Sequence, residues 1–204
     1  MFSTKGQEVK TGGGTPKSLQ PGVVYAHITS GSLRTSSKGD KMMLELYLET
    51  PELENFEGWP IDKDNPEGPK HKGQVGRIGA TIWTDQFDSS NIAVNDIMYK
   101  LTVIATELNL RDELNAMPDA ETITDWVKGA VDIVKGKNTY WFLKGTEEEY
   151  NGKTIIKLSL PKYKFVSTEQ TKLDKFDKTN KYHYKALTTT SVTNFEPVTN
   201  DFEV

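Results

Sequence analysis

The chain has 204 residues, 35% of them hydrophobic and 26% charged, with 25 lysines and arginines against 29 acids and no cysteine. This length suits one domain with a tail and is enough to bury a core. The missing cysteines exclude a disulfide framework, a thiol nucleophile and a cysteine-ligated zinc site. The net charge of −4 argues against a bulk polycation, although the local distribution of charge decides nucleic-acid binding.

The N-terminal region indicates no membrane or export segment. No apolar run in the chain approaches the roughly 18 residues that a membrane span needs. Residues 1–20 lack an apolar core of the signal-peptide kind, so no signal peptide is expected. They contain three consecutive glycines and a proline, which predicts a flexible arm. A chain without cysteine fits the reducing cytoplasm, which is the expected location.

The first half of the chain shows strand periodicity. Residues 22–34 and 41–50 alternate apolar and polar side chains around a short polar turn, which predicts a hairpin. Ser30–Ser32 interrupts the first strand with a glycine and indicates a bulge or bend. Residues 51–73 hold four prolines and three glycines, which predicts a long loop. Residues 74–83 then form a third predicted strand.

The period changes to that of a helix and later returns to that of a strand. Apolar residues recur every three or four positions in 89–110 and again in 120–135, which predicts two amphipathic helices. Residues 137–145 and 153–166 follow as the fourth and fifth strands. Asn151–Gly152 lies between them as a tight-turn signal, and the acidic run before it is interpreted as a solvated loop.

This order of elements predicts the fold class and the domain organisation. Three strands, a helical insert and two strands indicate a mainly β, five-stranded OB-fold-like barrel, with two helices between strands three and four. A jelly roll would want about eight strands. The expected divisions are a flexible arm at 1–20, an OB-fold-like domain at 21–166 with its helical insert at about 88–136, and a lysine-rich linker with an acidic tail at 167–204.

No pattern in the sequence indicates catalysis. The three histidines form no metal-binding spacing, and no Walker loop is present. The glycines at 73–79 match no dinucleotide fingerprint and are interpreted as bends in a strand. We therefore expect no enzyme, no cofactor and no metal, although dispersed carboxylates leave an enzyme open as a third hypothesis.

Aromatic and basic residues suggest a nucleic-acid surface. Single-stranded nucleic acid is held by bases stacked on aromatic rings while lysine and arginine follow the phosphates. Trp83 and Trp141 are the predicted stacking residues. The alternative is that these aromatic residues belong to the core. The full set of candidates, several of them beside the two hairpin turns, is Arg34, Lys38, Lys41, Tyr47, Arg77, Trp83, Trp141, Lys144, Lys157, Lys162 and Tyr163.

Charge is segregated near the C-terminus. Residues 162–185 hold seven lysines against three acids, a net charge of +4. Residues 186–204 hold three acids and no base, a net charge of −3. An acidic end of this kind can lie in a basic groove until nucleic acid displaces it, or can remain merely solvated. The candidate partner-binding residues of this tail are Glu196, Asp201, Phe202 and Glu203.

The sequence resembles the single-stranded DNA-binding proteins of tailed bacteriophages. The resemblance rests on the OB-like strand order, on YWFLKG followed by a turn and KTIIKLSLPKYKFV, and on the NDFEV end, and it covers roughly residues 20–166 and the tail. It implies a noncatalytic protein that coats single-stranded DNA without sequence preference during phage replication and recombination, in the host cytoplasm. It also implies that the acidic tail contacts phage replication proteins.

A second function class remains open. A noncatalytic virion or assembly protein could also use a flexible arm, a proline-rich loop and an acidic end. Such a protein would present a large apolar surface and would associate with DNA only weakly and without salt dependence.

Overall fold

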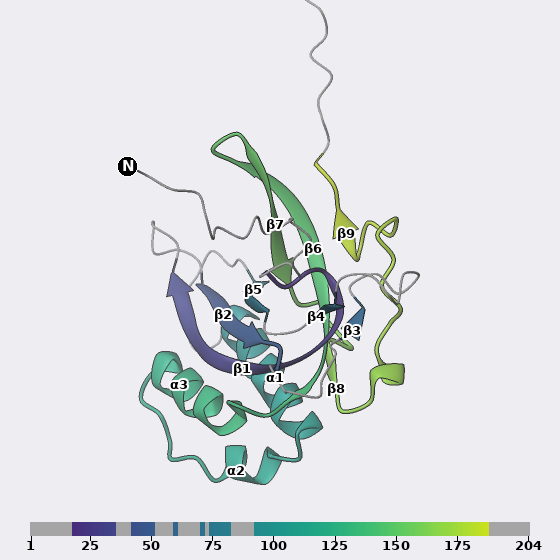
Figure 1. Ribbon diagram of the computed structural model, residues 1–204. Coiled ribbons are helices and arrows are strands. Elements are labelled where there is room, and N and C mark those ends of the chain that lie inside the picture. Colours follow the sequence, from purple (N-terminus) through teal and green to yellow (C-terminus); the bar gives the residue numbers. More distant parts are fainter. Residues whose placement is uncertain are drawn as a thin grey trace, which may run out of the picture.

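The computed structural model describes residues 18–35, 42–51, 59–60, 70–71, 74–82 and 92–187 (Figure 1). These residues are mainly β, with a seven-stranded sheet, a separate two-stranded sheet and three α-helices. The strands are β1 (Gly22–Thr35), β2 (Met42–Glu49), β3 (Trp59–Pro60), β4 (Lys70–His71), β5 (Val75–Ile82), β6 (Thr139–Tyr150), β7 (Lys153–Ser159), β8 (Val166–Ser167) and β9 (Tyr184–Lys185). The helices are α1 (Ile92–Glu107), α2 (Arg111–Asn115), α3 (Ile123–Val134) and the 3-10 helix η1 (Gln170–Lys172).

Five of the strands form a ring. Hydrogen-bonded pairing runs from β1 to β2, β5, β7 and β6, and β6 pairs with β1 again. Every pairing in the ring is antiparallel except that of β5 with β7, which joins Ile78 to Leu158 and Gly79 to Ser159. The expected mainly β fold is confirmed, and the helices lie between the third and fourth strands of the ring.

The alternation of apolar side chains explains the packing of the first two strands. Val24, Ala26 and Ile28 point into the core from β1, and the leucines of β2 meet them. The register of β1 against β2 shifts between Ile28 and Ser30, next to Ser30–Ser32, where the sequence predicted a bulge or bend. At Gly31, an added Cβ would lie 2.8 Å from the Val131 side chain of α3. The glycine therefore allows α3 to pack closely against β1.

The helices cover one end of the ring in Figure 1. The N-terminus of α3 is capped by Thr122, whose hydroxyl accepts a hydrogen bond from the Asp125 amide at 3.1 Å. Its C-terminus is followed by Gly136 with a φ of 74°, and the Gly136 amide donates to Ile28 O. The short helix α2 was not predicted, because it is five residues long and buries only Leu114. None of the described helices is long and apolar enough to cross a membrane.

The β6–β7 hairpin is longer than the sequence suggested. β6 continues to Tyr150, and Asn151 and Gly152, with φ values of 52° and 70°, form a two-residue turn into β7. The acidic run Glu147–Glu149, interpreted above as a loop, is therefore paired with β7. β7 ends at Ser159, ahead of Pro161, which cannot donate a backbone hydrogen bond.

The segment expected to be a linker packs against β6 up to residue 187. β8 and β9 both pair with β6, β9 in the parallel sense. The Tyr184 hydroxyl donates to Glu147 Oε1 at 2.5 Å. The Phe176 ring lies 6.2 Å from that of Phe142. Most of the predicted arm, 1–17, and the acidic tail, 188–204, lie outside the described residues.

Candidate nucleic-acid interface

A row of aromatic and basic side chains crosses the outside of the ring. Tyr47 on β2 is paired with Arg77 on β5, and both are exposed. The next residue of β5, Ile78, is buried opposite Leu158 of β7. Because side chains alternate along a strand, the preceding residues Arg77 and Lys157 both point outward. We call Tyr47, Arg77, Lys157 and Lys185 the outward row.

The register continues this row onto the last strand. Lys157 is paired with Thr146 of β6, and Thr146 is paired with Lys185 of β9. Lys185 is exposed, whereas its neighbour Tyr184 is buried. The outward row therefore runs from β2 to β9 without leaving the outer surface of the sheet.

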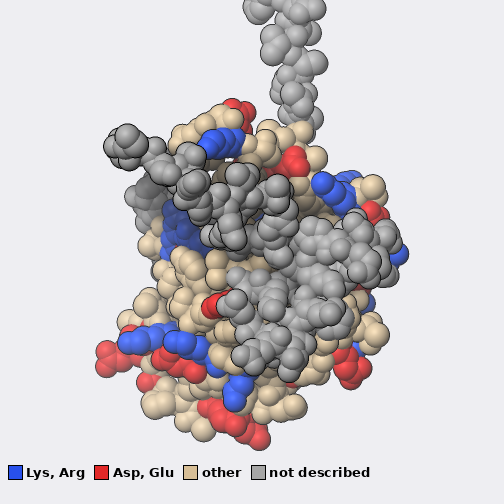
Figure 2. Space-filling view, viewed as in Figure 1, with Lys and Arg blue, Asp and Glu red and all other residues tan. Residues whose placement is uncertain are grey.

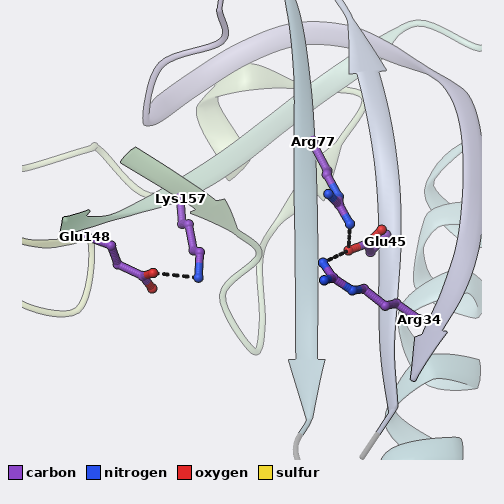
Figure 3. Close-up of polar contacts among 5 residues, drawn as sticks. All are labelled: Arg34, Glu45, Arg77, Glu148 and Lys157. Carbon is purple, nitrogen blue, oxygen red and sulfur yellow. Dashed lines mark hydrogen bonds and ion pairs between the residues drawn. The ribbon is translucent and has the colours of Figure 1, made fainter. Parts of the chain in front are cut away.

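A buried carboxylate organises the arginines beside Tyr47. Glu45 is only 4% exposed, and it accepts hydrogen bonds from Arg77 and, at 3.3 Å, from Arg34 (Figure 3). The Arg77 guanidinium also lies 5.9 Å from the centroid of the Tyr47 ring. The three charges sum to +1, so the cluster remains cationic while its arginines are held in fixed directions.

The two lysines near the base of the hairpin differ in their partners. Lys157 forms an ion pair with Glu148 at 2.6 Å, and the two side chains are 61% and 43% exposed (Figure 3). Exposed pairs of this kind contribute roughly 0–1 kcal/mol, so a phosphate can replace Glu148 at little cost. Lys144 is half-buried and has no ion pair within the described residues. Lys144 is paired with Ser159, on the outward side of β6.

The structure removes Trp141 from the stacking residues. Its side chain is fully buried, and its indole Nε1 donates to Ala26 O at 3.0 Å. Tyr140, Trp141 and Phe142 are consecutive on β6, so alternation required at least one of them to face inward, and it is the tryptophan that does. Phe142 is also buried, because it packs against Phe176 and the His183 ring from the C-terminal segment.

Lys162 and Tyr163 lie beside α1 and not on the outward row. The hydrogen bond with Tyr163 raises the pKa of Lys162, with smaller contributions from Asp96 and Tyr99 of α1. Tyr163 is 59% exposed, with Lys162 Nζ 5.2 Å from its ring centroid. The other candidates, namely Lys38, Lys41, Trp83, Glu196, Asp201, Phe202 and Glu203, lie outside the described residues.

One exposed aromatic side chain was not selected from the sequence. Tyr150 is 64% exposed at the tip of the β6–β7 hairpin, opposite Lys153. Its position directly before the Asn151–Gly152 turn could have predicted this exposure, because a side chain at the tip of a hairpin lies far from the hydrophobic core. On the outward side of β1 and β6, Tyr25 and Tyr140 face each other with ring centroids 4.9 Å apart.

The described residues contain no group of three histidines, aspartates or glutamates placed to hold a metal ion. A large pKa shift occurs where the C-terminal segment meets β6. Burial, and then the hydrogen bond to Glu147, raises the pKa of Tyr184 to about 12. The same bond lowers the pKa of Glu147, with a further contribution from the Leu187 amide.

No protein-family model matches this chain, and no curated protein matches it.

Proposed function

We propose that this protein binds single-stranded DNA without sequence preference and coats it during phage replication and recombination, without catalysing a reaction. The observation that carries the proposal is the outward row, which places an exposed tyrosine beside cations on adjacent strands. Bases stack on aromatic faces while cations track the backbone, and neither interaction depends on sequence.

The order of the ring supports an OB-fold for this role. An OB-fold is a five-stranded Greek-key barrel that binds oligonucleotides on the face of its second and third strands. Here β2 and β5 hold those places and carry Tyr47 and Arg77. The loop between the fourth and fifth strands, which OB-folds also use, corresponds to the hairpin tip with Tyr150 and Lys153.

Binding would begin with a base on the Tyr47 ring. Stacking of a base on an aromatic side chain is worth about 1–3 kcal/mol. Arg77 lies next to that ring and is directed by Glu45, so a phosphate adjacent to the stacked base meets a positioned guanidinium. Lys157 would exchange Glu148 for the next phosphate, and Tyr150 would close over the strand from the hairpin.

A titration tests the proposal. A fluorescent oligo-dT of about 30 nucleotides, longer than a single OB-fold covers, is titrated at low and at moderate salt with duplex DNA as control. Preferential binding of the single strand that weakens with salt is the expected result. Equal binding of duplex and single strand, or no binding at low salt even after removal of 188–204, would exclude the coating role.

The acidic tail enters the proposal as a site for other proteins. Glu196, Asp201, Phe202 and Glu203 would contact phage replication proteins once DNA occupies the basic surface. Truncation after residue 187 should leave DNA binding intact or stronger, and should abolish co-sedimentation of the DNA-bound protein with its replication partners.

One observation favours the alternative of a virion or assembly protein. Ile155 and Ile156 are 39% and 40% exposed, and they lie on opposite faces of β7 near the exposed Tyr150. Exposed apolar residues on a protruding hairpin suit a protein contact. Stable self-association that Ile156→Thr disrupts, together with salt-insensitive DNA binding, would favour this alternative.

A further inference from the structure

The C-terminal segment carries four lysines that form no ion pair with any other described residue. Lys175, Lys178, Lys181 and Lys185, here called the C-terminal lysine cluster, are all exposed. No carboxylate within the described residues lies within 4.0 Å of any of their ammonium groups. Figure 2 shows lysine or arginine atoms on the side of the molecule where Figure 1 places β9.

Two other lysines near the same segment behave differently. Lys164 forms an ion pair with Asp174 at 3.6 Å, and Lys172 forms one with Glu169 at 2.8 Å. The segment therefore contains both paired and unpaired cations of similar exposure. A comparison of the paired with the unpaired lysines can therefore show whether binding depends on where a lysine lies or only on its charge.

The backbone of the segment holds the cluster in place. β9 pairs with β6 at Gly145 and Thr146. Glu147 accepts from the Tyr184 hydroxyl at 2.5 Å and from the Leu187 amide at 2.9 Å. Asn180 O accepts from the amides of the residues three and four positions later, at 2.8 and 2.9 Å. A segment fixed in this way presents its lysines without a further cost in backbone entropy.

The cluster also contains exposed aromatic surface. Tyr182 is 70% exposed, with Lys181 Nζ 5.4 Å from its ring centroid. Lys178 Nζ lies 5.0 Å from the centroid of the buried Tyr184 ring. The exposed Tyr182 ring beside a cation is the combination that holds single-stranded nucleic acid.

The cluster is continuous with the proposed binding face. Lys185 belongs to the outward row, three strand spacings from Arg77 in the order β5, β7, β6, β9. Neighbouring strands lie about 4.8 Å apart, so the row from β5 to β9 is about 14 Å long. A strand of DNA that passes Tyr47 and Arg77 can therefore reach the cluster along the outward row.

We propose that the C-terminal lysine cluster is a second phosphate-binding surface for the same DNA strand, and that it supplies most of the salt-dependent part of the affinity. This inference rests on the proposed function. The charges of Arg34, Arg77 and Lys157 are partly neutralised by carboxylates, whereas the cluster exchanges only solution counterions. Release of those counterions is what makes binding depend on salt.

Two matched variants of the full-length protein test the inference. Lys175→Gln with Lys181→Gln removes two unpaired charges of the cluster that do not belong to the outward row, and Lys164→Gln with Lys172→Gln removes two paired charges. For single strands, each phosphate contact contributes about 0.7 to the slope of log K against log salt. We expect the first variant to lower the slope by about 1.4 and the affinity for oligo-dT at low salt by about tenfold or more, and the second to leave the slope unchanged.

The outcomes separate the two proposals. Thermal unfolding of both variants first establishes that each is folded. Both are expected to fold, because all four substituted side chains are exposed. Equal loss of slope in the two variants would mean that only net charge matters, which overturns the inference while the proposed function stands. Absence of binding by the unaltered protein would overturn both.

Discussion

The sheet face and the C-terminal segment use positive charge in different ways. On the sheet, Arg34 and Arg77 both bind Glu45, which is almost fully buried. On the C-terminal segment, four exposed lysines form no ion pair with any carboxylate of the described residues. The guanidinium of an ion-paired arginine is held in a defined orientation, but its charge is largely neutralised by the acid. An unpaired lysine keeps its full charge, but its ammonium group has no fixed orientation. The comparison suggests that one region orients the bound strand and the other attracts it.

The largest effect is expected from Tyr47. Tyr47→Ala removes the stacking ring and should weaken binding of oligo-dT by about 1–3 kcal/mol, roughly 5- to 150-fold, with an unchanged salt slope. Tyr47→Phe should retain affinity, because stacking needs the ring and not the hydroxyl. Tyr99→Ala is the matched control, since Tyr99 has a similar exposure, 43% against 39%, and lies on α1. Equal losses of oligo-dT affinity in Tyr47→Ala and Tyr99→Ala would contradict the proposal that the sheet face orients the bound strand.

Glu45 tests whether pairing is what distinguishes the two regions. Glu45→Gln keeps the shape of the side chain and releases both arginines. Because the arginines are about half exposed, the loss of stability should be about 1–2 kcal/mol, less than for a fully buried pair. The salt slope should rise by about 0.7, as one freed arginine gains a phosphate. Urea unfolding and the salt titration measure the two effects, and an unchanged slope would contradict the comparison.

Substitution of Tyr184 tests whether its hydrogen bond to Glu147 anchors the C-terminal segment that carries the lysine cluster. Tyr184→Phe should lower the melting temperature by about 2–4 °C at neutral pH, as the loss of one hydrogen bond predicts. The pKa of Glu147 is lowered by folding, so its contribution should disappear as the pH falls through the folded value. The pKa of Tyr184 is raised to about 12, so the contribution is complete below the unfolded value near 10 and is lost as the pH rises toward 12.

Melting curves of the unaltered protein and Tyr184→Phe across pH measure this dependence. The difference between them should be widest in the neutral range and should narrow in acid and in strong alkali. The absence of any difference would mean that the ring packing of Tyr184, which phenylalanine retains, and not its bond to Glu147, anchors β9.

The smallest effect is expected at the exposed pair of Lys157 and Glu148. Glu148→Gln should change stability by less than about 1 kcal/mol, because both side chains are well accessible to solvent, which screens the pair. It should strengthen binding of oligo-dT by about twofold, since Lys157 no longer has to leave a carboxylate. Fluorescence anisotropy at low salt resolves a change of this size, and weaker binding would place Lys157 off the DNA path.

Local patterns in the sequence predicted much of the fold. The alternation in 22–34 and 41–50, the helical period in 120–135 and the Asn151–Gly152 turn all correspond to observed elements. The end of β6 was misplaced, because Glu147–Glu149 has the composition of a loop and is held in a strand by its partners on β7. Pairing across a hairpin overrode local composition there.

The candidate site was less accessible to prediction. Tyr47 and Arg77 were selected from alternation, and the structure pairs them on adjacent strands. Trp141 was selected on the same grounds and is buried, because three consecutive aromatic residues leave the facing of β6 undecided. Apart from Lys162, the lysines of 162–185 were recognised only as a net charge, with no indication of which were paired.

The sequence by itself determined the periods of the elements, the tight turn and the separation of charge near the C-terminus, because each depends on residues a few positions apart. The tertiary structure alone decided which side of β6 faces the core, that Glu45 binds Arg77 from 32 positions away, and that the C-terminal segment packs against β6. These outcomes depend on register and on contacts between distant segments. Local periodicity carries no information about either.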